Sequence, residues 1–75
     1  MDSQDAVTTV FREVLNLSTV DPEVGFLDLG GHSLLAVQVI ALLRERYKLR
    51  VPTLQFLENA SASAVAASSQ PLEGN

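Results

Sequence analysis

The chain has 75 residues, of which 47% are hydrophobic and only 5% aromatic, and its net charge is −4. This length suits one small domain, and the aliphatic composition favours an all-α bundle over a sheet sandwich. With one histidine and no cysteine, disulfides are excluded and no metal site is expected. No basic patch for nucleic acid, signal sequence or membrane-spanning segment is present. We therefore expect a cytoplasmic monomer.

The first predicted element is a helix over residues 3–16, followed by a long loop over residues 17–32. Apolar side chains recur at helical spacing in the helix, and Ser3 or Asp5 is available as its N-cap. In the loop this periodicity fails, although Asp21-Pro22 suits a brief turn. The loop also contains several apolar residues, which we expect to anchor it to the core: Val20, Phe26, Leu27 and Leu29.

The second predicted helix covers residues 33–48, and two short helices follow it. Val51-Pro52 interrupts the chain, after which Thr53 can cap a third helix that ends near residue 58. We expect Leu54 and Leu57 of that helix to face inward. Asn59 or Ser61 can cap a fourth helix that contains Ala62, Val65 and Ala66. Residues 1–68 are thus predicted to form the domain, and residues 69–75 a flexible tail.

The helix over residues 33–48 has more apolar surface than one core face requires. One stripe at helical spacing is the natural core face, and it consists of Ala36, Val39, Ile40, Leu43 and Tyr47. Another group points elsewhere, on the side of Ser33: Leu34, Val37, Gln38 and Ala41. A domain of this size cannot enclose both sides of the helix, so the second group predicts a docking surface. Burial of these residues under the long loop is the alternative.

Residues 30–34 read Gly-Gly-His-Ser-Leu, directly before the second predicted helix. The glycines allow a sharp, uncluttered turn, and Ser33 stands where a helix N-cap is expected. A hydroxyl at this positive helix end is also a good place for a phosphate ester, so Ser33 is either a plain cap or an attachment site. Catalysis by Ser33 alone is disfavoured, since the adjacent His32 is the only histidine and adjacent side chains at a helix start do not face each other.

Residues 26–36, Phe-Leu-Asp-Leu-Gly-Gly-His-Ser-Leu-Leu-Ala, resemble the attachment motif of peptidyl carrier (thiolation) domains from nonribosomal peptide synthetases. The resemblance extends over residues 7–67, and its Leu-Gly-Gly-His-Ser-Leu string is highly specific. It implies a right-handed four-helix bundle of acyl-carrier type, with a long first loop and a short third helix. The chain departs from the family pattern at Gly25, where Asp or Asn is usual, and also at Leu27 and Ala60.

The resemblance also implies a function. Ser33 would carry a 4′-phosphopantetheine arm whose thiol holds an acyl or aminoacyl thioester, and Gly30, Gly31 and His32 would form the turn beside it. The implied partners are a phosphopantetheinyl transferase and the adenylation, condensation, thioesterase or tailoring enzymes of nonribosomal peptide synthesis. The chain would be a carrier with no catalytic residues of its own.

Two alternatives to a peptidyl carrier remain. One is an acyl carrier of a polyketide or hybrid pathway, although such carriers typically have Asp before the serine and acidic residues along the second helix. Here His32 precedes Ser33, and no acid follows until Glu45. The other alternative is an unmodified helical adaptor, which would not need an exposed serine beside two glycines.

Overall fold

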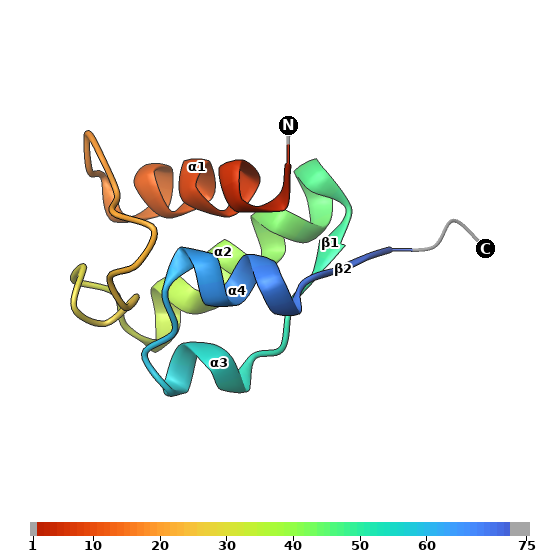
Figure 1. The fold of residues 1–75 in the computed structure, drawn as a ribbon. Helices are drawn as coiled ribbons and strands as arrows, with labels where there is room; N and C mark the ends of the chain where they lie inside the picture. Colours follow the sequence, from red (N-terminus) through yellow and green to blue (C-terminus); the bar gives the residue numbers. More distant parts are fainter. Residues whose placement is uncertain (1, 73–75) are drawn as a thin grey trace.

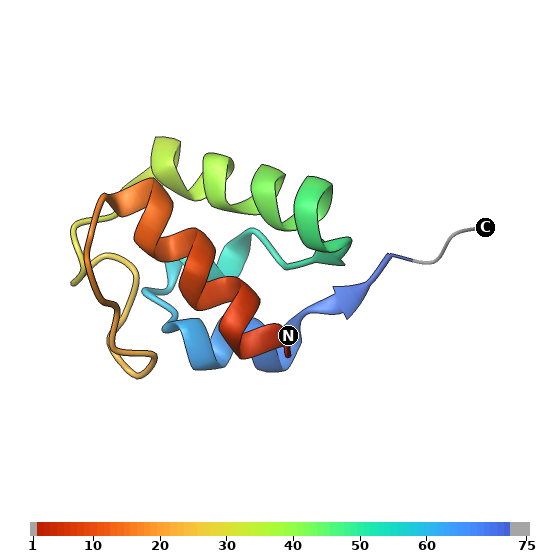
Figure 2. The same cartoon turned by 90° about the horizontal axis from the view of Figure 1, so that it is seen from above.

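The computed structural model describes residues 2–72, without the side chains of residues 55 and 57. Its elements are α1 (Ser3–Leu15), α2 (Ser33–Tyr47), β1 (Leu49–Arg50), α3 (Leu54–Leu57), α4 (Ala62–Ser68) and β2 (Gln70–Pro71). Helix α1 packs against both α2 and α4, and the single turn α3 packs against α2 (Figure 1). Seen from above, α1 and α2 cross at an angle (Figure 2). The fold is therefore mostly helical, with one short strand pair.

The N-terminus of α1 is capped by Asp2, so the predicted caps Ser3 and Asp5 were wrong. The Asp2 Oδ1 atom accepts a hydrogen bond of 2.8 Å from the Asp5 backbone N–H, which places Asp5 inside the first turn. At the other end, Asn16 adopts a left-handed backbone with φ of 58° and closes the helix. The helix thus ends one residue earlier than predicted.

Three phenylalanine rings form the centre of the core. Phe11 of α1, Phe26 of the long loop and Phe56 of α3 are at most 1% exposed. The Phe26 ring lies 5.1 Å from each of the other two in edge-to-face contact, a favourable geometry for aromatic pairs. The predicted core stripe of α2 is confirmed, since Ala36, Val39 and Leu43 are buried and Ile40 and Tyr47 pack partly buried against the core.

Helix α3 differs from the prediction in the side chain that it buries. Leu54 is 67% exposed, so the expectation that it faces inward was wrong, and the Leu57 side chain lies outside the described residues. Phe56 enters the core instead and contacts the other two phenylalanines. The larger aromatic ring of Phe56 gains more from burial than the Leu54 side chain would.

The strand pair is an addition to the predicted all-α fold. Leu49 pairs with Pro71 and Arg50 with Gln70, and the Leu72 N–H donates a 2.7 Å hydrogen bond to the Lys48 carbonyl oxygen. Pro71 has no N–H to donate, which suits a strand this short. Part of the segment predicted to be a flexible tail thus pairs with β1, and residues 73–75 lie outside the described residues. The domain boundary at residue 68 stays a prediction.

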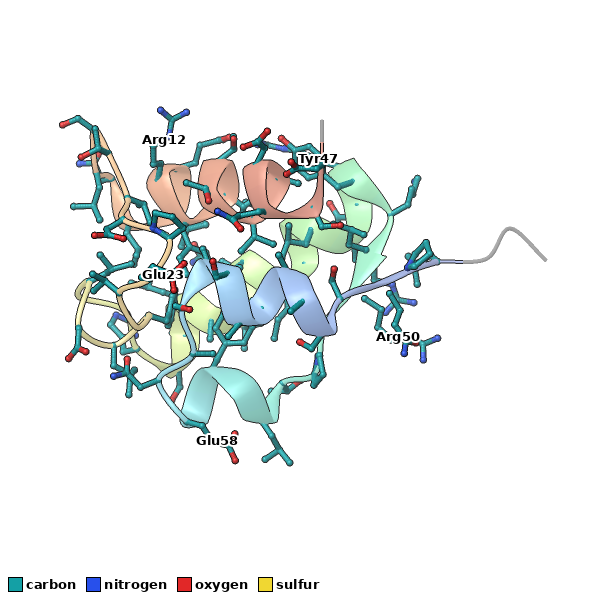
Figure 3. All side chains as sticks on the ribbon, in the orientation of Figure 1. Arg12, Glu23, Tyr47, Arg50 and Glu58 are labelled. Carbon is teal, nitrogen blue, oxygen red and sulfur yellow. The ribbon has the colours of Figure 1, made fainter. Side chains whose placement is uncertain are left out.

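The long loop is anchored, as expected, although Leu27 does not contribute to this. Val20 and Phe26 are buried, whereas Leu27 is 44% exposed. Glu23, labelled in Figure 3 beside the start of α4, accepts a 2.7 Å hydrogen bond from the Ser63 hydroxyl. The Ser63 backbone N–H also donates to the Pro22 carbonyl oxygen at 2.9 Å. The loop is therefore fixed to α4 by polar contacts as well as by apolar burial.

One ion pair joins α1 to α2 at the surface. The Arg46 Nη1 atom lies 2.8 Å from both carboxylate oxygens of Glu13. The hydrogen bond and the negative charge of Glu13 raise the pKa of Arg46. Both side chains are about half exposed, so this pair contributes little to stability. No helix within residues 2–72 is both long and apolar enough to cross a membrane.

Candidate functional site

The turn that leads into α2 is held by its own backbone hydrogen bonds. The Leu29 N–H donates to the Gly25 carbonyl oxygen at 3.1 Å, and the Gly31 N–H donates to the Phe26 carbonyl oxygen at 3.0 Å. Gly30 has a φ of 98°, a conformation that side chains rarely adopt. Gly31 lies so close to the Phe26 ring that a Cβ atom there would overlap it. The backbone conformation at Gly30 and the close packing at Gly31 thus explain why the motif has glycine at both positions.

Ser33 is the first residue of α2 and not its N-cap, so the predicted capping role was wrong. His32 is the N-cap, with an extended backbone, and its carbonyl oxygen accepts the first helical hydrogen bond, from the Ala36 N–H at 2.9 Å. The His32 side chain makes no capping hydrogen bond. The helix therefore begins at Ser33, as predicted, but the Ser33 hydroxyl is not needed as its cap.

The Ser33 side chain is exposed, and its hydroxyl has no hydrogen-bond partner among the described residues. It stands at the end of α2 where unpaired backbone N–H groups and the helix dipole favour negative charge. The first turn of α2 contains no acidic residue to oppose an anion. A Cβ atom added at Gly30 would meet no atom within 4 Å, so there is open space beside the turn. These features fit a phosphate ester on Ser33.

His32, the residue before Ser33, is exposed, and no hydrogen bond joins its imidazole to the serine hydroxyl within residues 2–72. Nor does that part of the chain gather three side chains of the kinds that bind metal ions. Among the described residues, the Ser33 hydroxyl is thus exposed and not hydrogen-bonded to a base that could activate it.

The predicted docking side of α2 is open to solvent. Leu34 is 66% exposed and Val37 is 59% exposed, while Gln38 and Ala41 are also exposed. Burial under the long loop, the alternative raised from the sequence, is therefore wrong. An open groove of about 580 Å³ continues along the helix, and it is lined by Val37, Ile40, Ala41, Arg44, Glu45, Lys48 and Leu72. Leu54 of α3 adds a further exposed apolar side chain, which the sequence pattern had assigned to the core.

Comparison with known proteins assigns the family. A family model described as the phosphopantetheine attachment site matches residues 5–68, a range that contains the glycine turn and Ser33. The chain belongs to this family. It is thus a phosphopantetheine attachment domain, and the resemblance stated from residues 26–36 is confirmed.

The relatives of this attachment domain are much longer proteins. A probable non-canonical nonribosomal peptide synthetase, CymA of Salinispora arenicola, is 40% identical over 63 residues, or 84% of this chain. One of the linear gramicidin synthase proteins of Brevibacillus parabrevis is 33% identical over 69 residues, which cover 92% of this chain. Hybrid PKS-NRPS synthetase TAS1 of Pyricularia oryzae is 50% identical over 42 residues, or 55% of this chain. The attachment domain spans only 1–2% of the length of these relatives.

Solved structures agree with the fold of the attachment domain. A structure titled as a nonribosomal PCP domain matches with a TM-score of 0.87 and 25% identity, covering 97% of this chain and 94% of that one. A chain from the structure of phosphopantetheine transferase Sfp with coenzyme A and a peptidyl carrier protein matches with a TM-score of 0.79 and 22% identity, covering 89% and 87%. The second likeness concerns the fold alone.

Proposed function

We propose that this domain is a peptidyl carrier and that Ser33 holds its 4′-phosphopantetheine group. It would carry an aminoacyl or peptidyl unit between the enzymes of a nonribosomal peptide or hybrid synthetase. The observation that carries the proposal is the exposed Ser33 hydroxyl, free of partners among the described residues, at the start of α2. The turn α3 would be the third helix of a four-helix carrier bundle, and residues 1–68 would form the carrier domain.

The residues around Ser33 support attachment in distinct ways. The Ser33 Oγ atom would form the new bond to the phosphorus of coenzyme A while the nucleotide leaves, and the serine proton would pass to a base of the transferase. Free N–H groups at the start of α2 favour the phosphate charge by about 0.3–1 kcal/mol at an exposed site. Gly30, which borders open space, keeps a side chain away from the approaching enzyme, and the exposed His32 is available for contact with it. When attached, the group supplies a thiol that holds the acyl unit.

The test of this function is the mass of the intact protein. Unmodified protein is incubated with coenzyme A and a phosphopantetheinyl transferase, and we expect a gain of one phosphopantetheine group. The modified protein is then offered to adenylation enzymes with their amino acids and ATP, and an aminoacyl thioester should form. A protein that gains no mass, under conditions that fully modify a known carrier, would contradict the proposal.

The exposed side of α2 is proposed to dock partner enzymes, and Val37→Asp tests this. Val37 is 59% exposed, so we expect its replacement to leave the melting temperature nearly unchanged and to lower the rate of aminoacyl loading. Val39 provides a matched control on the same helix, since it is fully buried and Val39→Asp should unfold the domain. A large fall in the melting temperature of Val37→Asp, or unchanged loading, would contradict the docking role of this surface.

The type of partner can be tested by salt. If apolar contacts around Leu34, Val37 and Ala41 dominate recognition, loading should persist at high ionic strength, because salt does not screen apolar burial. Charge contacts are largely screened near 1 M salt, where the Debye length is about 3 Å. The measurement is the initial rate of thioester formation across a salt series, corrected for the salt sensitivity of the enzyme itself.

Glu45→Gln tests the charge of the groove in the same salt series. Glu45 is the first acidic residue of α2, and it is exposed. With an apolar docking surface, this substitution should leave both the rate and its salt dependence unchanged. A steep, carrier-specific fall with salt that Glu45→Gln flattens would instead favour an acyl carrier recognised through its charges.

A further inference from the structure

Asn59, in the connection between α3 and α4, makes side-chain contacts with the turn that precedes Ser33. Its Oδ1 atom accepts hydrogen bonds from the Leu27 N–H at 2.8 Å and the Asp28 N–H at 3.3 Å. Its Nδ2 atom donates to the Asp28 Oδ2 atom at 3.0 Å. Beside it, the Ala60 carbonyl oxygen accepts a 2.8 Å hydrogen bond from the Phe26 N–H. One amide side chain thus joins two segments that are far apart in the sequence.

These contacts have the pattern of a helix cap supplied from outside the turn. In an ordinary N-cap, a side-chain oxygen accepts hydrogen bonds from the backbone N–H groups two or three residues further along the chain. For a turn that begins at Gly25, these are the N–H groups of Leu27 and Asp28. Gly25 has no side chain that could reach them, and the Asn59 Oδ1 atom accepts from both.

Gly25 and Asn59 also fit each other sterically. A Cβ atom at Gly25 would overlap the Asn59 side chain and would lie 2.5 Å from the Asn59 carbonyl oxygen. The absence of a side chain at residue 25 therefore makes room for the cap from residue 59. Asn59 has a φ of 60°, a left-handed conformation that asparagine tolerates better than most residues.

We propose that Asn59 is a positioning residue for the modification of Ser33. By capping the turn at Leu27 and Asp28, it would hold the segment that leads through the two glycines into α2. The Ser33 hydroxyl would then meet the transferase in one orientation. The effect on modification rests on the proposed function of Ser33, whereas the cap itself can be measured on the unmodified domain.

The first test compares Asn59→Gly with Asn16→Gly. Both substitutions remove an asparagine side chain from a residue with a left-handed backbone. Asn16 is the matched control because it closes α1 and its side chain does not bind the turn before Ser33. Amide hydrogen exchange should show roughly fivefold less protection of Leu27 and Asp28 in Asn59→Gly, the scale of one lost cap. The Ala36 amide inside α2 serves as an internal reference for global unfolding.

The same two variants are then assayed with the transferase. For Asn59→Gly we expect KM to rise by up to about fivefold, the limit set by one lost cap, with kcat little changed because the reacting groups are intact. Asn16→Gly should behave as the unaltered domain in both measurements. Unchanged protection of Leu27 and Asp28 in Asn59→Gly would overturn the cap, and an unchanged KM despite lost protection would overturn the positioning role.

Exchanging the side chains of residues 28 and 59 gives a sharper test than the glycine variants. Asn59→Asp alone would place two carboxylates at the 3.0 Å contact with Asp28. It should lower the exchange protection of Leu27 and Asp28 and raise KM. Adding Asp28→Asn restores the contact with the amide donor at residue 28 and the carboxylate acceptor at residue 59. The double variant should therefore recover most of the protection and most of the original KM. A double variant no better than Asn59→Asp would overturn the proposal. If the unaltered domain is never modified, the proposed function fails, while the exchange data still decide whether the cap exists.

Discussion

Replacing Ser33 with alanine should abolish phosphopantetheinylation completely while the domain stays folded. Ser33 is exposed and is not the N-cap of α2, so its loss should cost less than the roughly 1 kcal/mol of a typical cap. The measurements are the intact mass after incubation with the transferase and coenzyme A, and the thermal melt. Ser18→Ala, at another exposed serine, is the control and should be modified normally. Modification of Ser33→Ala would show that the attachment site is elsewhere, and unfolding would show that Ser33 is mainly structural.

Replacing Phe26 with alanine should destabilise the domain by about 3–5 kcal/mol, the usual cost of removing a buried phenylalanine. Phe26 is completely buried between Phe11 and Phe56 and also covers Gly31. A loss of this size approaches the whole stability of a small domain, so we expect a largely unfolded protein. Urea denaturation followed by circular dichroism measures the change.

The neighbouring Leu27 is the control for Phe26→Ala. It lies in the same loop and is 44% exposed, so Leu27→Ala should change the free energy of unfolding by much less. Equal effects of the two substitutions would show that the aromatic cluster is not the centre of the core.

The longest helices and the family could be predicted from local sequence patterns. Helical spacing located α2 to within a residue and identified its buried stripe, because α2 repeats one pattern over many turns. The family assignment depended on a short string around Ser33 whose glycines have local structural roles. The exposure of Leu34 and Val37 followed from counting apolar residues against the core that a small domain can form.

The features that the sequence did not reveal depend on contacts between distant segments. Leu54 and Phe56 are both apolar, and only the position of the other two phenylalanines determines which of them is buried. The pairing of Gln70–Pro71 with β1 depends on where α4 ends in space. Asn59 was considered as a cap for α4, whereas its side chain caps a turn over thirty residues earlier in the chain. Periodicity within one segment contains no information on such partners.

The strand pair also determines where residue 72 lies relative to α2. β2 runs beside β1, which directly follows α2, so the chain reaches residue 72 at the end of α2 opposite Ser33 (Figure 1). The 15 residues of α2 separate the two points by about 22 Å. A polypeptide joined after residue 72 would therefore hold the domain at one end of α2, with Ser33 at the other end of this rigid helix. If Ser33 is the attachment site, rotation about the joined end would move Ser33 over a wide range of positions without any bending of the pantetheine arm.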